Sequence, residues 1–219
     1  LALQAAERLA HWVGDGGFAA ECRGLHERLA KGFHSAFWSQ ERQAYRTALG
    51  GAGEACYTEM VQALALCARL VPQQQEQTLR ALLASSGSGL VPMTLSHSIF
   101  KYDALMQEPE RYAGQVIETV AEVWGSMLFR GATSFWETIL GADDFDYAGS
   151  LCHGWSAVPI YLFGRYLLGV YPENPGFEGW RPGFALGAQE RAEGVVPTPR
   201  GSIRVTVQEQ GLCYEECAG

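Results

Sequence analysis

The sequence has few cysteines, no excess of basic charge and no long apolar run. Six cysteines in 219 residues are too few and too scattered for a disulfide scaffold. A membrane-spanning helix needs about 18 or more uninterrupted apolar residues, and we find no such run. With 16 basic against 24 acidic residues the formal net charge is −8, so the chain offers no basic footprint for nucleic acid or an anionic bilayer. We therefore expect neither nucleic-acid nor membrane partners.

Metal and cofactor motifs are also scarce. The closest cysteine pair, Cys213 and Cys217, has three residues between its members and no second pair to complete a thiolate zinc site. The sequence also has no phosphate-binding loop, dinucleotide fingerprint, H-E-x-x-H or G-x-S-x-G motif. We predict no metal and no cofactor. The missing motifs also argue against a nucleotide-binding protein, a zinc protease or an α/β-hydrolase.

The compartment is only weakly indicated. Scattered free cysteines slightly favour the reducing cytoplasm. The chain opens at Leu1 with a helical pattern already running, so we expect the natural N-terminus to lie upstream, and secretion stays open because a leader peptide could be there.

What the sequence does contain is helical periodicity. Hydrophobic residues make up 47% of the chain, which is enough to build a core. Their spacing predicts helices of two alternating kinds, some apolar on most sides and others amphipathic. This alternation is typical of an α/α toroid, in which helical hairpins surround a central cavity, and about four hairpins fit the chain. The predicted helices are 1–13, 22–38, 58–71, 73–84, 98–107, 111–130 and 156–168.

The character of the chain changes after Val170. Five prolines follow within about thirty residues, and the segment from Ser202 to Val207 alternates polar and apolar residues like a strand. We therefore predict a mainly α fold with two domains. Residues 1–168 are the second part of an (α/α)6 barrel, and residues 169–219 are an incomplete C-terminal β-sandwich, since two or three strands alone are marginally stable.

The densest chemistry lies between the last two long helices, in the non-helical segment from Gly131 to Trp155. Glu137 in this segment has two interpretations. It completes an S-x-x-E pattern with Ser134, so it could cap a helix start. It could instead be the general base of an inverting glycosidase, which needs one carboxylate to activate water opposite an acid.

The neighbours of Glu137 also leave alternatives open. Trp136 is either a core residue or a platform for the apolar face of a sugar. His153 either caps the following helix or donates a hydrogen bond to a sugar hydroxyl. Asp143, Asp144 and Asp146 suggest a solvated turn more than a calcium loop, whose motif is absent. Asp146, His153 and Ser156 include the residue types of a hydrolytic triad, an arrangement that nothing else in the sequence supports.

Four motifs in this order resemble bacterial α-L-rhamnosidases of glycoside hydrolase family 78. They are GATSFWE (131–137), SLCHGWSAVPIYLF (150–163), LGVYPENPGF (168–177) and AEGVVPTPRGSIRV (192–205), and weaker similarity extends upstream through FWSQERQAYRT (37–47). Two positions depart from the family pattern: Ser134 replaces the commoner threonine, and Cys152 stands where many members have asparagine.

The resemblance implies an (α/α)6 barrel followed by a β-sandwich, and inverting hydrolysis of terminal α-L-rhamnosyl groups from a rhamnose-containing glycoside or polysaccharide. The proposed base of the family falls on Glu137, and Trp136, His153 and Trp155 fall where the family lines the sugar pocket. The acidic motif that supplies the catalytic acid has no match here, so we expect this fragment alone to be inactive.

Two alternatives stay open at this stage. One is a non-catalytic carbohydrate-binding α-toroid domain, and the other is a related toroid glycosidase that acts on another sugar. The sequence defines no oligomeric state.

Overall fold

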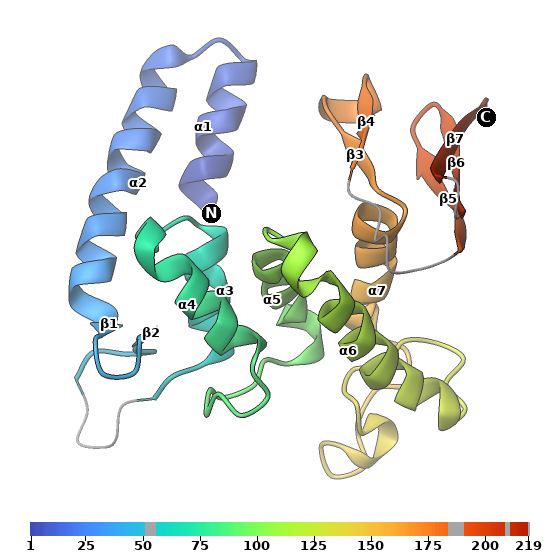
Figure 1. The fold of residues 1–219 in the computed structure, drawn as a ribbon, viewed down its shortest axis with the longest axis horizontal. Coiled ribbons are helices and arrows are strands. Elements are labelled where there is room, and N and C mark those ends of the chain that lie inside the picture. Colours follow the sequence, from blue (N-terminus) through green and yellow to red (C-terminus); the bar gives the residue numbers. More distant parts are fainter. Residues whose placement is uncertain (51–55, 184–190, 209–210, 219) are drawn as a thin grey trace. The chain divides into compact units, whose positions relative to one another are not determined.

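The structure, a computed structural model, describes residues 1–50, 56–183, 191–208 and 211–218. Helices dominate the chain up to residue 167, apart from one short pair of strands within residues 38–45, and antiparallel strands follow from residue 170 to the C-terminal end (Figure 1). This order agrees with the prediction of a mainly helical chain with a β tail. Among the described residues, no helix is long and apolar enough to cross a membrane.

The helices and strands have the following bounds. The helices are α1 (Ala2–Trp12), α2 (Gly16–Phe37), α3 (Glu59–Cys67), α4 (Gln73–Ala84), α5 (Ser98–Leu105), α6 (Pro109–Phe129) and α7 (Val158–Leu162). The strands are β1 (Trp38–Ser39), β2 (Ala44–Tyr45), β3 (Val170–Pro172), β4 (Trp180–Pro182), β5 (Ala192–Thr198), β6 (Gly201–Gln208) and β7 (Gly211–Ala218). Short 3-10 turns lie at Leu95–His97, Gly141–Asp143, Gly154–Ser156 and Pro175–Phe177.

The structure divides into two compact units, Leu1–Leu105 and Met106–Gly219. The predicted domain boundary at residues 168 and 169 stays a prediction, and the 169–219 domain includes positions outside the described residues. Each unit is described by itself below.

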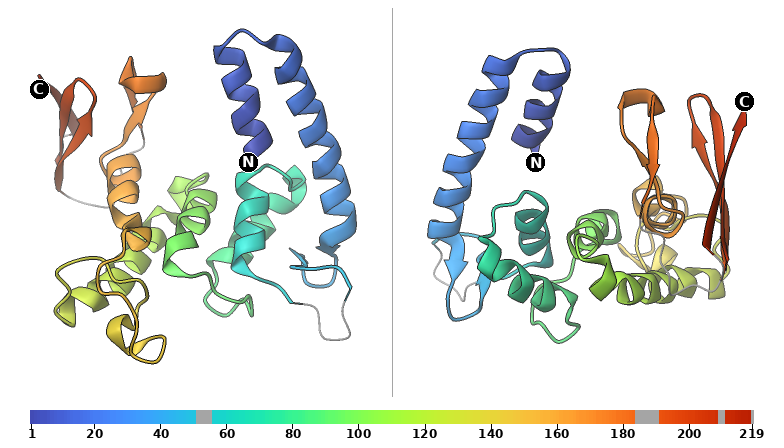
Figure 2. Two further views of the ribbon diagram at one scale, coloured as in Figure 1. Left: turned by 180° about the vertical axis from the view of Figure 1, so that it is seen from behind. Right: turned by 45° about the horizontal axis from the view of Figure 1, so that its top comes forward.

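The first unit begins with a helical hairpin whose two arms, α1 and α2, lie side by side in every view (Figures 1 and 2). Gly14 supplies the turn with a φ of +80°, and the Asp15 side chain accepts a hydrogen bond from the Phe18 N–H. This cap starts α2 at Gly16. The predicted helix at 22–38 therefore begins too late, because the cap at Asp15 satisfies a free N–H of the first turn and lets the helix start at Gly16.

The core of the first unit is built around α3. Thr58 caps this helix, and the buried Gln62 amide exchanges two hydrogen bonds with the Tyr45 backbone, N–H to Oε1 at 2.8 Å and Nε2 to C=O at 2.9 Å. The helix ends at Cys67 and not at Val71 as predicted. Arg69 takes a φ of +54°, so the chain turns while the sequence stays apolar.

The second unit begins with α6, which ends at Phe129, and Gly131 follows with a φ of +86°. A glycine in this left-handed conformation commonly ends a helix. The helix predicted over residues 156–168 is shorter than expected. It consists of α7, with Pro159 in its first turn, followed by a π-helical turn, Phe163–Leu167.

The strands of the second unit form two separate antiparallel sheets, β3–β4 and β5–β6–β7. Ile203, Val205 and Val207 on β6 pack with Leu168 and Val170 into one apolar cluster. The strand predicted over Ser202–Val207 is confirmed, and it lies centrally between β5 and β7. A sandwich of two facing sheets stays a prediction.

Candidate functional site

Two loop segments of the second unit, 134–137 and 150–153, run alongside each other. The His153 N–H donates to the Phe135 carbonyl at 2.7 Å, and the Glu137 N–H donates to the Ser150 carbonyl at 2.9 Å. The Ser134 hydroxyl donates to the Leu151 carbonyl. Residues 132–140 form no helix, so the capping interpretation of Ser134 and Glu137 is wrong. The serine ties one loop to the other.

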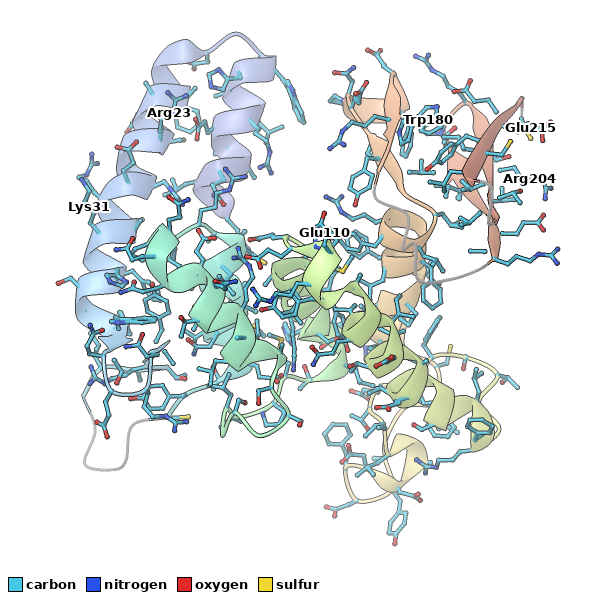
Figure 3. The ribbon with its side chains drawn as sticks, viewed as in Figure 1. Arg23, Lys31, Glu110, Trp180, Arg204 and Glu215 are labelled. Atoms are coloured by element: carbon cyan, nitrogen blue, oxygen red, sulfur yellow. The ribbon has the colours of Figure 1, made fainter. Side chains whose placement is uncertain are left out.

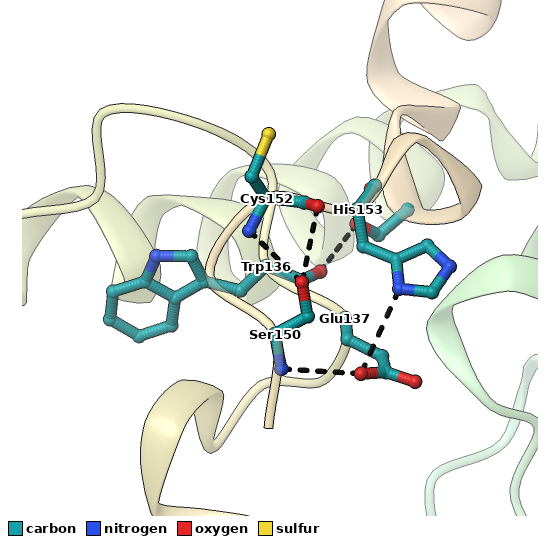
Figure 4. Close-up of polar contacts among 6 residues, drawn as sticks. Trp136, Glu137, Ser150, Cys152 and His153 are labelled. Carbon is teal, nitrogen blue, oxygen red and sulfur yellow. Dashed lines mark hydrogen bonds and ion pairs between the residues drawn. The ribbon is translucent and has the colours of Figure 1, made fainter. Parts of the chain in front are cut away.

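This pairing orients the Glu137 carboxylate (Figure 4). Its Oε2 accepts a hydrogen bond from the Ser150 N–H at 3.2 Å and lies 3.7 Å from the His153 Nδ1. The side chains of Glu137 and His153 are 33% and 26% exposed. A carboxylate is thus held by backbone next to an imidazole, in a place that water and a ligand can reach.

His153 precedes the 3-10 turn at Gly154–Ser156, and its side chain makes no capping hydrogen bond. The capping interpretation of His153 is therefore wrong. Its ring meets the Trp155 ring edge-on, with 5.1 Å between the centroids and 65° between the planes. Trp155 is 70% exposed, so its indole face is accessible beside the imidazole.

Trp136 differs from Trp155 because only 7% of it is exposed. The Arg130 guanidinium lies over the indole at 4.9 Å from its centroid. Gly141 lies so near that a Cβ added there would be 2.5 Å from the ring Cε3. Burial and these contacts favour the core interpretation of Trp136, in which the indole supports the loop that carries Glu137.

Ser156 is a buried residue of this site whose role the sequence did not indicate. Its hydroxyl lies within hydrogen-bond distance of the Trp136 and His153 carbonyl oxygens, and its own carbonyl accepts from the Trp124 Nε1 at 2.7 Å. A hydroxyl committed to backbone carbonyls and closed off from solvent is no nucleophile, so the triad interpretation of Ser156 is wrong.

Two of the acidic residues of the loop have partners within the loop or beside it. Asp143 pairs with Arg130 at 3.0 Å, and Asp144 accepts a hydrogen bond from the Phe145 N–H. Within the described ranges, no group of three or more His, Cys, Asp or Glu side chains could hold a metal ion. The solvated-turn interpretation fits these contacts.

The assembled site therefore has three chemical parts. Glu137 can accept a proton from a water molecule, His153 can donate to or accept from a hydroxyl group, and Trp155 offers a π face to apolar C–H groups. Proton acceptance beside an aromatic platform is the chemistry that one half of a glycosidase site requires.

Comparisons with solved structures agree with the resemblance drawn from the four motifs. The chain is 27% identical to the GH78 family rhamnosidase of Bacillus sp. GL1, with a TM-score of 0.79 over 94% of this chain and 22% of that one. It is 23% identical to a Klebsiella oxytoca rhamnosidase with rhamnose bound, with a TM-score of 0.62 over 74% of this chain and 31% of the other. The Streptomyces avermitilis α-L-rhamnosidase complexed with L-rhamnose is 18% identical, with a TM-score of 0.69 over 94% and 20% of the two chains.

The similarity to α-L-rhamnosidases of family 78 is thereby confirmed. No protein-family profile and no curated protein sequence matches the chain. The chain spans between about a fifth and a third of the length of these solved rhamnosidases.

Proposed function

We propose that this chain is the C-terminal part of an inverting glycoside hydrolase that releases terminal α-L-rhamnosyl groups, with Glu137 as the general base. The observation that carries the proposal is the carboxylate of Glu137, fixed by the Ser150 N–H and lying 3.7 Å from His153 in an accessible loop. The rhamnosidases similar to this chain, two of them with rhamnose bound, support the choice of sugar.

In the proposed reaction, Glu137 removes a proton from a water molecule as the water oxygen attacks the anomeric carbon. The bond between that carbon and the glycosidic oxygen breaks, and a carboxylic acid on the opposite side protonates the departing oxygen. One water is consumed and rhamnose leaves with its anomeric configuration inverted. His153 binds a sugar hydroxyl, and Trp155 packs against the C–H face of the ring.

Trp136 has a different role in this proposal from the one that the resemblance implied. Its ring is buried under Arg130 and against Gly141, so Trp136 supports the loop that carries Glu137. The sugar stacks on the exposed Trp155 instead.

The acid and the rest of the pocket come from elsewhere in the complete enzyme. We propose that the helices of this chain are part of an (α/α)6 toroid and that the acid lies upstream. Loss of one member of an acid and base pair typically costs 10²- to 10⁴-fold in rate, so the 219-residue chain alone should be inactive.

The test is Glu137→Gln in the complete enzyme. The amide keeps the size of the side chain and cannot accept the proton, so kcat on an aryl α-L-rhamnoside should fall by about 10²- to 10⁴-fold while rhamnose binding persists. The matched control is Glu193→Gln, an exposed carboxylate on β5 that pairs with Arg204. Turnover within a few-fold of wild type in Glu137→Gln would remove Glu137 as the base.

The sugar and the stereochemistry are tested separately. NMR of the first product formed should show the β anomer of rhamnose, which is the inverted configuration. Aryl fucosides and glucuronides should be poor substrates of the same preparation. Preference for either of these would keep the glycosidase and replace rhamnose as the substrate.

A further inference from the structure

The second unit contains a pocket that is formed by the β3–β4 hairpin region and the β5–β7 sheet. Its volume is about 540 Å³, within the range of roughly 300 to 1,000 Å³ typical of small-molecule sites. The described residues that line it lie between positions 177 and 217, so none of them belongs to the loop that carries Glu137.

One wall of this pocket is aromatic and is fixed in place. Trp180, labelled in Figure 3, is the first residue of β4, and its side chain lies on the side of the hairpin that faces the sheet. Its Nε1 donates to the Glu216 carboxylate, and its ring packs against the Tyr214 ring at a centroid distance of 5.1 Å. Phe177 packs against the same apolar cluster. The wall is therefore rigid apolar surface with a carboxylate at its edge.

The lining of the pocket also includes adjustable polar groups. Glu178 and Arg200 face each other at 4.0 Å, and their side chains are 70% and 67% exposed. An ion pair this long and this exposed contributes little to the free energy of folding. Both side chains can therefore rotate toward a ligand with little loss of stability. The Ser202 hydroxyl also lines the pocket.

We propose that this pocket is a second carbohydrate-binding site, distinct from the catalytic one. A pyranose combines an apolar C–H face with a rim of hydroxyl groups that donate and accept hydrogen bonds. Trp180 and Phe177 match the face, Glu178 and Glu216 accept from the rim, and Arg200 donates to it. The site would hold a neighbouring sugar unit of the substrate chain and raise the local concentration of that chain.

The choice of a sugar as ligand rests on the proposed function, so the test reads the two sites separately. The full 219-residue chain is labelled with 5-fluorotryptophan, and its six tryptophans are followed by ¹⁹F NMR during titration with methyl α-L-rhamnopyranoside. The single variants Trp180→Phe and Trp155→Phe assign the two reporter resonances. Glycerol, a polyol without a ring, is the ligand control.

We expect the Trp180 resonance to shift and saturate with the rhamnoside and to stay still with glycerol. Arg200→Ala should weaken this binding at least tenfold, and Glu178→Gln should also weaken it. Arg204→Ala, which breaks the similar exposed pair with Glu193 on the same sheet but does not line the pocket, should leave it unchanged.

The outcomes separate this inference from the proposed function. A Trp180 resonance that stays still, or one that shifts equally in Arg200→Ala and Arg204→Ala, overturns the second site. A saturable Trp180 shift supports the second site whether or not the Trp155 resonance moves, and the proposed function is decided separately by Glu137→Gln in the complete enzyme.

Discussion

Glu137 and Ser150 exchange two hydrogen bonds across thirteen residues of loop. The Glu137 N–H donates to the Ser150 carbonyl at 2.9 Å, and the Ser150 N–H donates to the Glu137 Oε2 at 3.2 Å. One residue pair thus fixes both the backbone and the carboxylate of the proposed base. The orientation of the carboxylate therefore depends on a side chain long enough to bring it to the Ser150 N–H.

Glu137→Asp in the complete enzyme tests this dependence. Aspartate is shorter by one methylene, so its carboxylate cannot hold the same position relative to the Ser150 N–H. A displacement of about 1 Å can cost on the order of 10²-fold in rate. We expect kcat to fall by about that factor with little change in KM, measured by steady-state hydrolysis of an aryl rhamnoside.

The control for this change is Glu193→Asp on β5, which shortens an exposed carboxylate outside the site and should leave kcat unchanged. If Glu137→Asp retains full activity, the hydrogen bond from Ser150 does not set the reacting position.

Gly141 is a second point at which the site depends on close packing. Its φ is +61°, and an added Cβ would lie 2.5 Å from the Trp136 ring. Gly141→Ala should therefore combine backbone strain of roughly 1 to 2 kcal/mol with overpacking of roughly 1 to 3 kcal/mol. Urea unfolding followed by tryptophan fluorescence measures the sum.

The matched variant is Gly131→Ala, where φ is +86° and nothing lies within 4 Å of the added Cβ. It isolates the strain, so Gly141→Ala should destabilise the protein by the larger amount. Equal losses of unfolding free energy in the two variants would mean that the Trp136 ring moves away freely.

The sequence predicted helices well where strong signals bound them. The predicted helix at residues 73–84 matches α4 at both ends, because Pro72 precedes it and the polar Ser85 follows. The length of α3 was overestimated because apolar residues continue past the turn at Arg69, and a buried turn looks like a buried helix in the hydrophobic pattern.

The π-helical turn after α7 was missed for a similar reason. The Phe163 carbonyl accepts a hydrogen bond from the Leu168 N–H, five residues on, at 2.7 Å. Because this segment is apolar on most sides, its hydrophobic pattern does not distinguish an α-helix from a π-helix.

In the site, the sequence located the residues with recognisable chemistry and missed those that support them. Glu137 and His153 could be found because a carboxylate and an imidazole stand out in a loop. The Ser150 backbone N–H donates to the Glu137 carboxylate 13 positions away, and the Ser156 hydroxyl donates to the Trp136 carbonyl 20 positions away. Such contacts depend on how the loop folds back, and no local motif encodes them.

Ser156→Ala tests the support from the second of these residues. Its hydroxyl is fully buried between the Trp136 and His153 carbonyls, and leaving a buried acceptor without its donor costs about 1 to 3 kcal/mol. We expect a loss of unfolding free energy in that range, measured by urea denaturation. Ser126→Ala is the control, because that hydroxyl donates to the Val123 carbonyl of its own helix, α6, and its loss should cost less than about 0.5 kcal/mol. Identical midpoints for the two variants would remove Ser156 as a support.

The thiol of Cys67 should be much less reactive than its exposed counterparts. Burial, with a smaller contribution from Asp103, raises the pKa of Cys67 to about 11, and the Sγ donates to the Phe100 carbonyl at 3.4 Å. Since the thiolate is the nucleophile, only about one molecule in a thousand is reactive at this position at pH 8. The reactive fraction should then rise about tenfold for each pH unit up to pH 10.

Iodoacetamide labelling of the native chain, read by peptide mass spectrometry, measures this difference. Cys67 should label on the order of 100-fold more slowly at pH 8 than Cys152, which is exposed. In urea, where burial is lost, the two thiols should react at similar rates, so the slow native rate belongs to the fold and not to the local sequence. Equal native rates at pH 8 would show that solvent and reagent reach the Cys67 thiol freely, and the packing of α3 against α5 would then be looser than the structure has it.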